Sequence, residues 1–149
     1  MIISISSSEI EKQQTSTQNI LTFQTLPLYQ PRDVSGLKEY NLKGSLHCFS
    51  GSLETAKIYT SMGYLLGIGG VVTFKNGVKL KEVVEGIDLE YLLLETDSPY
   101  LSPEPKRGKR NDSRNVKYIA EKVAEFKNVS VEEIAKITYE NAINVFNII

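Results

Sequence analysis

The sequence predicts an α/β fold built on a parallel sheet. From residue 42 onward, three stretches typical of strands are each followed by a stretch with helical spacing. Alternation of strand and helix along a chain is typical of α/β folds. The third strand, LEYLLLET at 89–96, contains three leucines in a row. A strand that is apolar on both faces belongs in a parallel sheet covered on both sides.

The first strand–helix unit begins with LKGSLH at 42–47, which ends at His47. Ser52 is a suitable N-cap for the helix that follows, because its hydroxyl can accept a hydrogen bond from a free backbone N–H. Gly63 is a suitable residue to end that helix, since glycine adopts the left-handed conformation without strain. We therefore expect a helix from about Ser52 to Gly63.

The second unit consists of YLLGIGGVV at 64–72, predicted as a strand, and a helix over 78–84 that ends at Gly86. Glycines inside a strand suggest that another group approaches the backbone closely. The glycine spacing does not match G-x-G-x-x-G, so we do not expect a dinucleotide site here.

Two helices are predicted after the third strand. Apolar residues recur at helical spacing over 116–124. Ser130 and Glu133 then form an S-x-x-E capping box ahead of further apolar residues.

The length, composition and net charge are those of one ordinary globular domain. The chain has 149 residues, 41% hydrophobic and 23% charged, with a net charge of −1. This net charge argues neither for nor against nucleic-acid binding, so any electrostatic steering must come from local patches. The single Cys48 excludes an internal disulfide and fits a reducing compartment. No signal peptide or membrane span is predicted, and the expected location is the cytoplasm.

The composition changes near residue 33. Residues 1–32 are rich in Ser, Thr and Gln, and their apolar residues follow no sustained period. We expect this divergent N-terminal segment to be poorly ordered or marginally helical. Residues 33–149 form the predicted folded domain.

Candidate site residues lie where predicted strands end. Glu95 and Asp97 are two residues apart, so an extended strand would point both carboxylates to one face. His47 ends an earlier strand, and the carboxyl ends of parallel strands converge on one crevice. An imidazole with a carboxylate makes half of a divalent-metal site. The alternatives are that Asp97 only caps the turn at Ser98 and that His47 is structural.

Two further features have structural alternatives. The segment 106–114 gathers five cations around one acid and suits a phosphodiester backbone, although such a cluster is often only a solvated loop. A Cys48–His47 nucleophile is not expected, because neighbouring strand residues point to opposite faces.

Taken together, these residues resemble the TatD family of metal-dependent deoxyribonucleases. Four segments carry the resemblance, which extends from about residue 33 to the end of the chain. They are HCFSGS at 47–52, MGYLLGIGGVVTFKN at 62–76, LLLETDSPYLSPEPKRGKRN at 92–111 and VSVEEIAKITYENAINVF at 129–146.

The resemblance implies a C-terminal fragment, about three strand–helix units, of a TIM-type (β/α)₈ barrel of the metal-dependent hydrolase type. It implies two divalent cations, Mg²⁺, Mn²⁺ or Zn²⁺, at the strand ends and DNA as substrate. The family's histidine before C-F-S-G falls on His47, a metal ligand. Its E-T-D aspartate falls on Asp97, a metal ligand and the catalytic base that orients the attacking water. Arg107 and Arg110 fall in a loop near the substrate.

The sequence also departs from the family pattern. A whole barrel needs on the order of 200 residues or more. The family's H-x-H pair, its bridging glutamate and a further histidine have no counterparts here, because His47 is the only histidine. NDSRN also replaces the more usual N-E-P. We therefore expect weak metal binding, little or no DNA hydrolysis, and an open sheet edge at the strand 42–47. Such an edge invites self-association or a complementing chain.

Three functional hypotheses follow. The first is a TatD-type nuclease that is active when another chain supplies the missing strands. The second is a truncated or decayed product without catalysis. The third is a weak nucleic-acid-binding protein that uses the basic segment 106–114.

Overall fold

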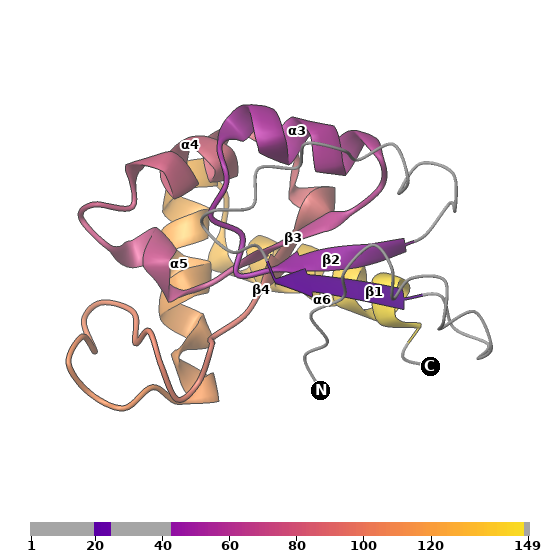
Figure 1. Cartoon of the computed structure of the whole chain (residues 1–149). Helices are drawn as coiled ribbons and strands as arrows, with labels where there is room; N and C mark the ends of the chain where they lie inside the picture. The colour runs from indigo at the N-terminus through magenta and orange to yellow at the C-terminus, as the bar shows by residue number, and fades with distance from the viewer. Residues whose placement is uncertain (1–19, 25–42, 148–149) are drawn as a thin grey trace.

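A four-stranded parallel sheet forms the centre of the chain. The computed structural model describes residues 20–24 and 43–147. The strands pair in chain order as β1-β2-β3-β4 (Figure 1). Their bounds are β1 Ile20–Gln24, β2 Lys43–His47, β3 Leu65–Ile68 and β4 Leu92–Leu94. All neighbouring pairs are parallel, which confirms the predicted α/β class.

The strand count differs from the sequence prediction. Ile20–Gln24 lies in the segment expected to be poorly ordered, yet it forms β1 and pairs with β2 along five residues. The predicted open edge at β2 is therefore wrong, because β1 occupies it. β-Branched and aromatic residues at 20–23 favour a strand, but five residues are too few to show a period. The boundary at residue 32 lies outside the described residues and stays a prediction.

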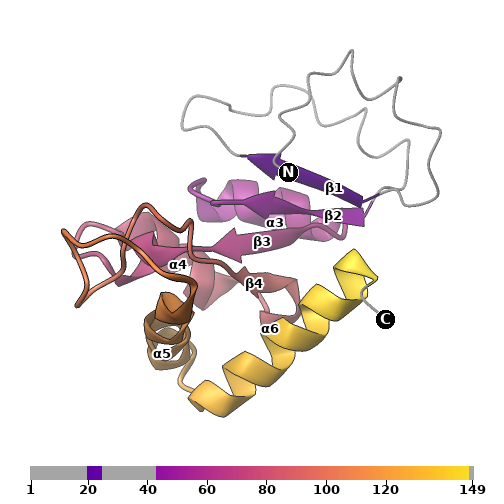
Figure 2. The same cartoon turned by 90° about the horizontal axis from the view of Figure 1, so that it is seen from below.

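Helices flank the sheet and follow the predicted order. In Figure 1, α3 and α4 lie above the sheet, and Figure 2 shows α6 beside β4, at the opposite edge from β1. The α-helices are α3 Leu53–Ser61, α4 Val78–Gly86, α5 Val116–Lys127 and α6 Val131–Phe146. Three short 3₁₀ helices in the described residues are η1 Gly70–Thr73, η2 Leu89–Tyr91 and η3 Ser113–Asn115.

The predicted helix signals operate as expected. The Ser52 hydroxyl accepts from the Thr55 N–H at 3.3 Å, and Gly63 follows α3 at a φ of +85°. The Ser130 hydroxyl accepts from the Glu133 N–H at 3.1 Å and begins α6. Each such cap satisfies a backbone donor that the helix itself leaves free, which fixes where the helix starts.

The core lies between the sheet and α3, α4, α5 and α6. Leu66 of β3, Val83 of α4 and Ile119 of α5 are each 0% exposed. The second and third predicted strands correspond to β3 and β4, and both are shorter than expected. The 3₁₀ helix η1 follows β3, and η2 precedes β4. A Cβ on Gly70, at the start of η1, would lie 2.4 Å from the Leu101 carbonyl oxygen. The segments that follow β3 and β4 are therefore in close backbone contact at this point.

None of the helices in the described parts of the chain is both long and apolar enough to cross a membrane.

Candidate metal centre

His47 lies between two carboxylates that come from the end of another strand. β2 ends at His47 and β4 ends at Leu94, and both strands point the same way. The His47 Nδ1 is 2.7 Å from Glu95 Oε2, and its Nε2 is 2.9 Å from Asp97 Oδ1. The three side chains are 16–19% exposed, so the cluster is partly shielded from water while still accessible. The predicted convergence of His47 and Asp97 is therefore present.

Gly67 makes room for this cluster. β3 separates β2 from β4, so the Glu95 side chain must cross β3 to reach His47. A Cβ on Gly67 would lie 2.5 Å from Glu95 Oε2, closer than real atoms approach. The glycine in the second predicted strand thus permits a close approach, and the approaching group is a carboxylate of the same chain.

Cys48 also joins the cluster, which the sequence did not predict. The expectation that His47 and Cys48 point to opposite faces is wrong, because β2 ends at His47 and Cys48 has a φ of 53°. The Cys48 backbone N–H donates to Glu95 Oε1 at 2.5 Å, and its thiol donates to Asp97 Oδ2. Burial, the hydrogen bond to Asp97 and the Glu95 charge raise the pKa of the Cys48 thiol. A protonated thiol is a poor nucleophile, so Cys–His catalysis remains unsupported.

Glu95 is held as a partly buried hydrogen-bond acceptor. Burial raises the pKa of the Glu95 carboxyl, and the His47 ring and the Cys48 N–H offset part of that increase. A carboxylate that accepts from the Nδ1 side of an imidazole leaves Nε2 to act as ligand, and it orients the ring. Glu95 was singled out in the sequence for its strand-end position and its spacing from Asp97, but no separate role was predicted for it.

Asn111 fixes the loop that carries Asp97. Its Nδ2 donates to the Thr96 carbonyl at 2.5 Å and to the Tyr100 carbonyl at 2.6 Å. Its backbone N–H donates to the Pro99 carbonyl at 3.0 Å. Asn111 is 4% exposed, and Asp97 has a φ of 55°. Three hydrogen bonds from one residue therefore hold both flanks of Asp97 in a backbone conformation that few non-glycine residues adopt.

The arginines of the basic segment 106–114 have partners outside this cluster or are exposed. The Arg107 guanidinium lies 4.0 Å from the centre of the Phe74 ring, and Arg110 is exposed. Arg114 pairs with Asp112 at 2.8 Å. Among the described residues, neither Arg107 nor Arg110 contacts His47 or the carboxylates, and their roles near a substrate stay predictions.

The donor atoms fit a divalent cation. One ligand atom each from His47, Cys48 and Glu95 can be chosen so that all lie within 4.8 Å of one another. Asp97 adds oxygen atoms on the Nε2 side of the ring. Imidazole nitrogen with carboxylate oxygen suits zinc or manganese, and oxygen atoms alone suit magnesium.

A parallel sheet that gathers an imidazole and carboxylates at the carboxyl ends of its strands has the arrangement of metal-dependent hydrolases built on (β/α)₈ barrels. A family model described as "TatD related DNase" matches residues 24–147. The chain belongs to the TatD family.

Similarity to curated relatives and to solved structures supports the assignment to this family. The chain is 53% identical over 105 residues to the uncharacterized metal-dependent hydrolase YabD of Bacillus subtilis, covering 70% of this chain and 41% of the relative. It is 43% identical over 105 residues to the uncharacterized metal-dependent hydrolase YcfH of Escherichia coli K12, covering 70% and 40%. The chain thus matches about two fifths of the length of these relatives.

Two solved structures share the fold. YJJV, a TatD homologue from Escherichia coli K12, superimposes with a TM-score of 0.76 at 27% identity, covering 87% of this chain and 51% of that one. A TatD family hydrolase from Entamoeba histolytica gives a TM-score of 0.71 at 22% identity, covering 85% and 50%. The predicted barrel fragment is therefore confirmed, with four strands in the described residues instead of three.

Proposed function

We propose that this chain carries part of the active site of a TatD-type metal-dependent hydrolase that cleaves phosphodiester bonds of DNA. The observation that supports this most directly is the His47 ring held between Glu95 and Asp97. Two strand ends separated by β3 supply these groups. A structural histidine needs one acceptor, whereas here both ring nitrogens face carboxylates in a partly shielded position.

The residues have different roles in this proposal. His47 Nε2 and the Asp97 carboxylate are the metal ligands. A bound divalent cation would lower the pKa of a water molecule and neutralise charge on the scissile phosphate. Asp97 accepts the proton of the attacking water, and Glu95 orients the His47 ring through Nδ1. Glu95 is thus a positioning residue, and the sequence-based assignment of His47 and Asp97 stays unchanged.

The ligand set within the 149 residues is small. A catalytic zinc site typically uses three protein ligands, and the H-x-H pair of the family cannot be present, because His47 is the only histidine. We expect the 149-residue chain to bind a divalent cation weakly and to hydrolyse little or no DNA by itself.

Metal binding and hydrolysis are tested separately on this chain. Mn²⁺ titration followed by electron paramagnetic resonance gives the affinity, and cleavage of a fluorogenic oligonucleotide with Mg²⁺ or Mn²⁺ gives the activity. Asp97→Ala is expected to abolish Mn²⁺ binding. Asp88→Ala serves as a matched control, because Asp88 is exposed and precedes β4 instead of following it.

The possible results separate the parts of the proposal. Equal Mn²⁺ affinity in Asp97→Ala and the parent chain would remove Asp97 from the metal site. DNA cleavage that Asp97→Ala abolishes would uphold the site and contradict the expected inactivity of the chain alone.

A second candidate function is nucleic-acid binding by the basic segment 106–114. Arg110 and Lys109 are exposed, and neither forms an ion pair with the described residues. Free guanidinium groups pair with phosphate oxygens. Arg110→Gln should lower the salt dependence of single-stranded DNA binding by about one counterion. Arg114→Gln should change it less, since Arg114 already pairs with Asp112.

A further inference from the structure

A cavity opens directly beside Asp97 and Cys48. It has a volume of about 520 Å³ and lies among the loops that follow β2, β3 and β4. Small-molecule pockets typically have volumes of roughly 300–1,000 Å³. Ligands of parallel α/β folds bind outside the carboxyl ends of the strands. The cavity is therefore large enough for a small ligand and continuous with the proposed metal centre.

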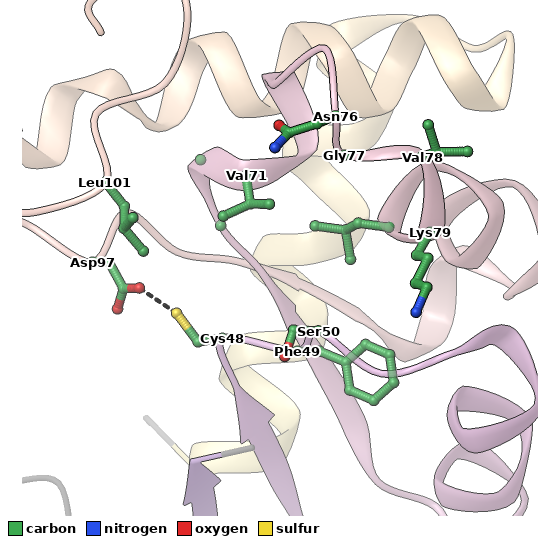
Figure 3. Close-up of a pocket in the computed structure, with 13 residues that line it drawn as sticks. Cys48, Phe49, Ser50, Val71, Asn76, Gly77, Val78, Lys79, Asp97 and Leu101 are labelled. Atoms are coloured by element: carbon green, nitrogen blue, oxygen red, sulfur yellow. Dashed lines mark hydrogen bonds between the residues drawn. The ribbon is translucent and has the colours of Figure 1, made fainter. Parts of the chain in front are cut away.

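The walls of the cavity are mainly apolar and are held by close backbone contacts. Val71 and Leu101 contribute side chains from opposite loops (Figure 3). A Cβ on Gly70 would lie 2.4 Å from the Leu101 carbonyl oxygen, and one on Gly77 would lie 2.6 Å from the Val71 carbonyl oxygen. These backbone contacts are already close, which limits how far the surrounding loops can close over the cavity.

The two ends of the cavity carry opposite charge. Figure 3 shows Asp97 and Cys48 on one side and Lys79 on the other, with Val71 between them and Asn76 nearby. Lys79 is exposed and takes part in none of the ion pairs within the described residues. A ligand that fits thus has a group suited to a metal at one end, an apolar body and a negative charge at the other end.

We infer that this cavity is the subsite for the nucleoside next to the scissile phosphodiester, with the following phosphate at Lys79. The inference rests on the proposed function, because the scissile phosphate is placed at His47 and Asp97. The base lies against Val71 and Leu101, and the Asn76 amide offers a donor and an acceptor to its polar edge. A purely apolar ligand would not use Lys79, and a single inorganic anion would leave the apolar walls uncovered.

In this inference the site on the chain holds one nucleotide unit of a nucleic-acid strand. One nucleoside, with one phosphate on each side of it, extends from the metal centre to Lys79. The two polar ends of the cavity should therefore favour a nucleoside 3′,5′-bisphosphate over a single phosphate.

The test compares two small probes, thymidine 3′,5′-bisphosphate and inorganic phosphate, on the 149-residue chain with saturating Mn²⁺. Isothermal titration is expected to give at least about tenfold tighter binding of the bisphosphate. Lys79→Gln should remove most of this gain and leave Mn²⁺ affinity unchanged. Lys75→Gln is the matched control, because Lys75 is also exposed, lies four residues away and does not line the cavity. Val71→Phe narrows the cavity and should also weaken bisphosphate binding.

Several results would overturn the inference. They are equal affinity for the two probes, equal loss in Lys79→Gln and Lys75→Gln, and full bisphosphate affinity in Val71→Phe. If the unsubstituted chain binds no Mn²⁺, this result contradicts the proposed function and not, by itself, the subsite. The subsite inference then survives only if the bisphosphate still binds in a Lys79-dependent way without metal, and otherwise it fails as well.

Discussion

Replacing Asn111 should weaken metal binding although Asn111 is not a ligand. In Asn111→Ala, the Thr96 and Tyr100 carbonyls lose the side-chain donors that hold the loop around Asp97. Two hydrogen bonds at about 1 kcal/mol each give a stability loss of about 2 kcal/mol. Residues that orient metal ligands typically contribute about 10–100-fold to metal affinity. We expect Mn²⁺ affinity to fall by roughly this factor. Alanine is preferable to aspartate, because a new carboxylate would itself attract cations.

Asn141 provides a control with nearly the same hydrogen bonds. Its Nδ2 donates to the Leu89 carbonyl at 2.8 Å and to the Leu92 carbonyl at 2.9 Å, at the start of β4 instead of its end. Asn141→Ala should therefore lose about the same stability, roughly 2 kcal/mol, but keep its Mn²⁺ affinity. Thermal unfolding measures the first effect and Mn²⁺ titration the second. An equal drop in affinity in both variants would show that Asn111 acts through general stability, and the argument from loop geometry would be refuted.

Three other changes have clear expected outcomes. Gly67→Ala places a Cβ 2.5 Å from Glu95 Oε2, so it should displace Glu95 and lower Mn²⁺ affinity about 10–100-fold; an unchanged affinity would remove Glu95 from the site. Leu66→Ala empties a fully buried position and should cost about 2–5 kcal/mol in chemical unfolding, and a loss below about 1 kcal/mol would contradict the assigned core. Arg114 holds the pKa of the Asp112 carboxyl at about 2, below its usual 3.8. The stabilisation is therefore present above pH 3.8 and lost as pH falls through about 2; in Arg114→Gln, NMR titration should show the Asp112 pKa rising toward 3.8.

The sequence predicted the parts of the site that depend on strand direction. His47 and Asp97 follow strands predicted to be parallel, and parallel strands place their carboxyl ends at one edge. Their convergence therefore needed no knowledge of side-chain geometry. Cys48 was missed because its position depends on a φ of 53° just after β2, which no period in the sequence encodes.

The contribution of Asn111 was missed for a different reason. The two carbonyls that accept from its Nδ2 lie 15 and 11 residues earlier in the chain. Such contacts depend on how a long loop folds back, and helix or strand periodicity carries no information about them. β1 was missed because a run of five residues in a Ser/Thr/Gln-rich segment shows too little alternation. In this chain, prediction from local pattern succeeded for long elements and failed for loops and for the short edge strand.

The position of β1 bears on the proposed incompleteness of the site. In the β1–β2 register, Gln24 lies opposite His47, so β1 ends at the same edge as the metal centre. Neighbouring strands lie about 4.8 Å apart. A further parallel strand beside β1 would thus end roughly 10 Å from the His47 backbone, a span that two side chains and a shared cation can bridge. Among the residues that the structure describes, β1 is the outermost strand on this side, and a strand edge can pair with a further strand. We therefore propose that ligands which these 149 residues lack would be supplied at the β1 edge. The corresponding edge at β4 is adjacent to α6 (Figure 2), which packs against β4.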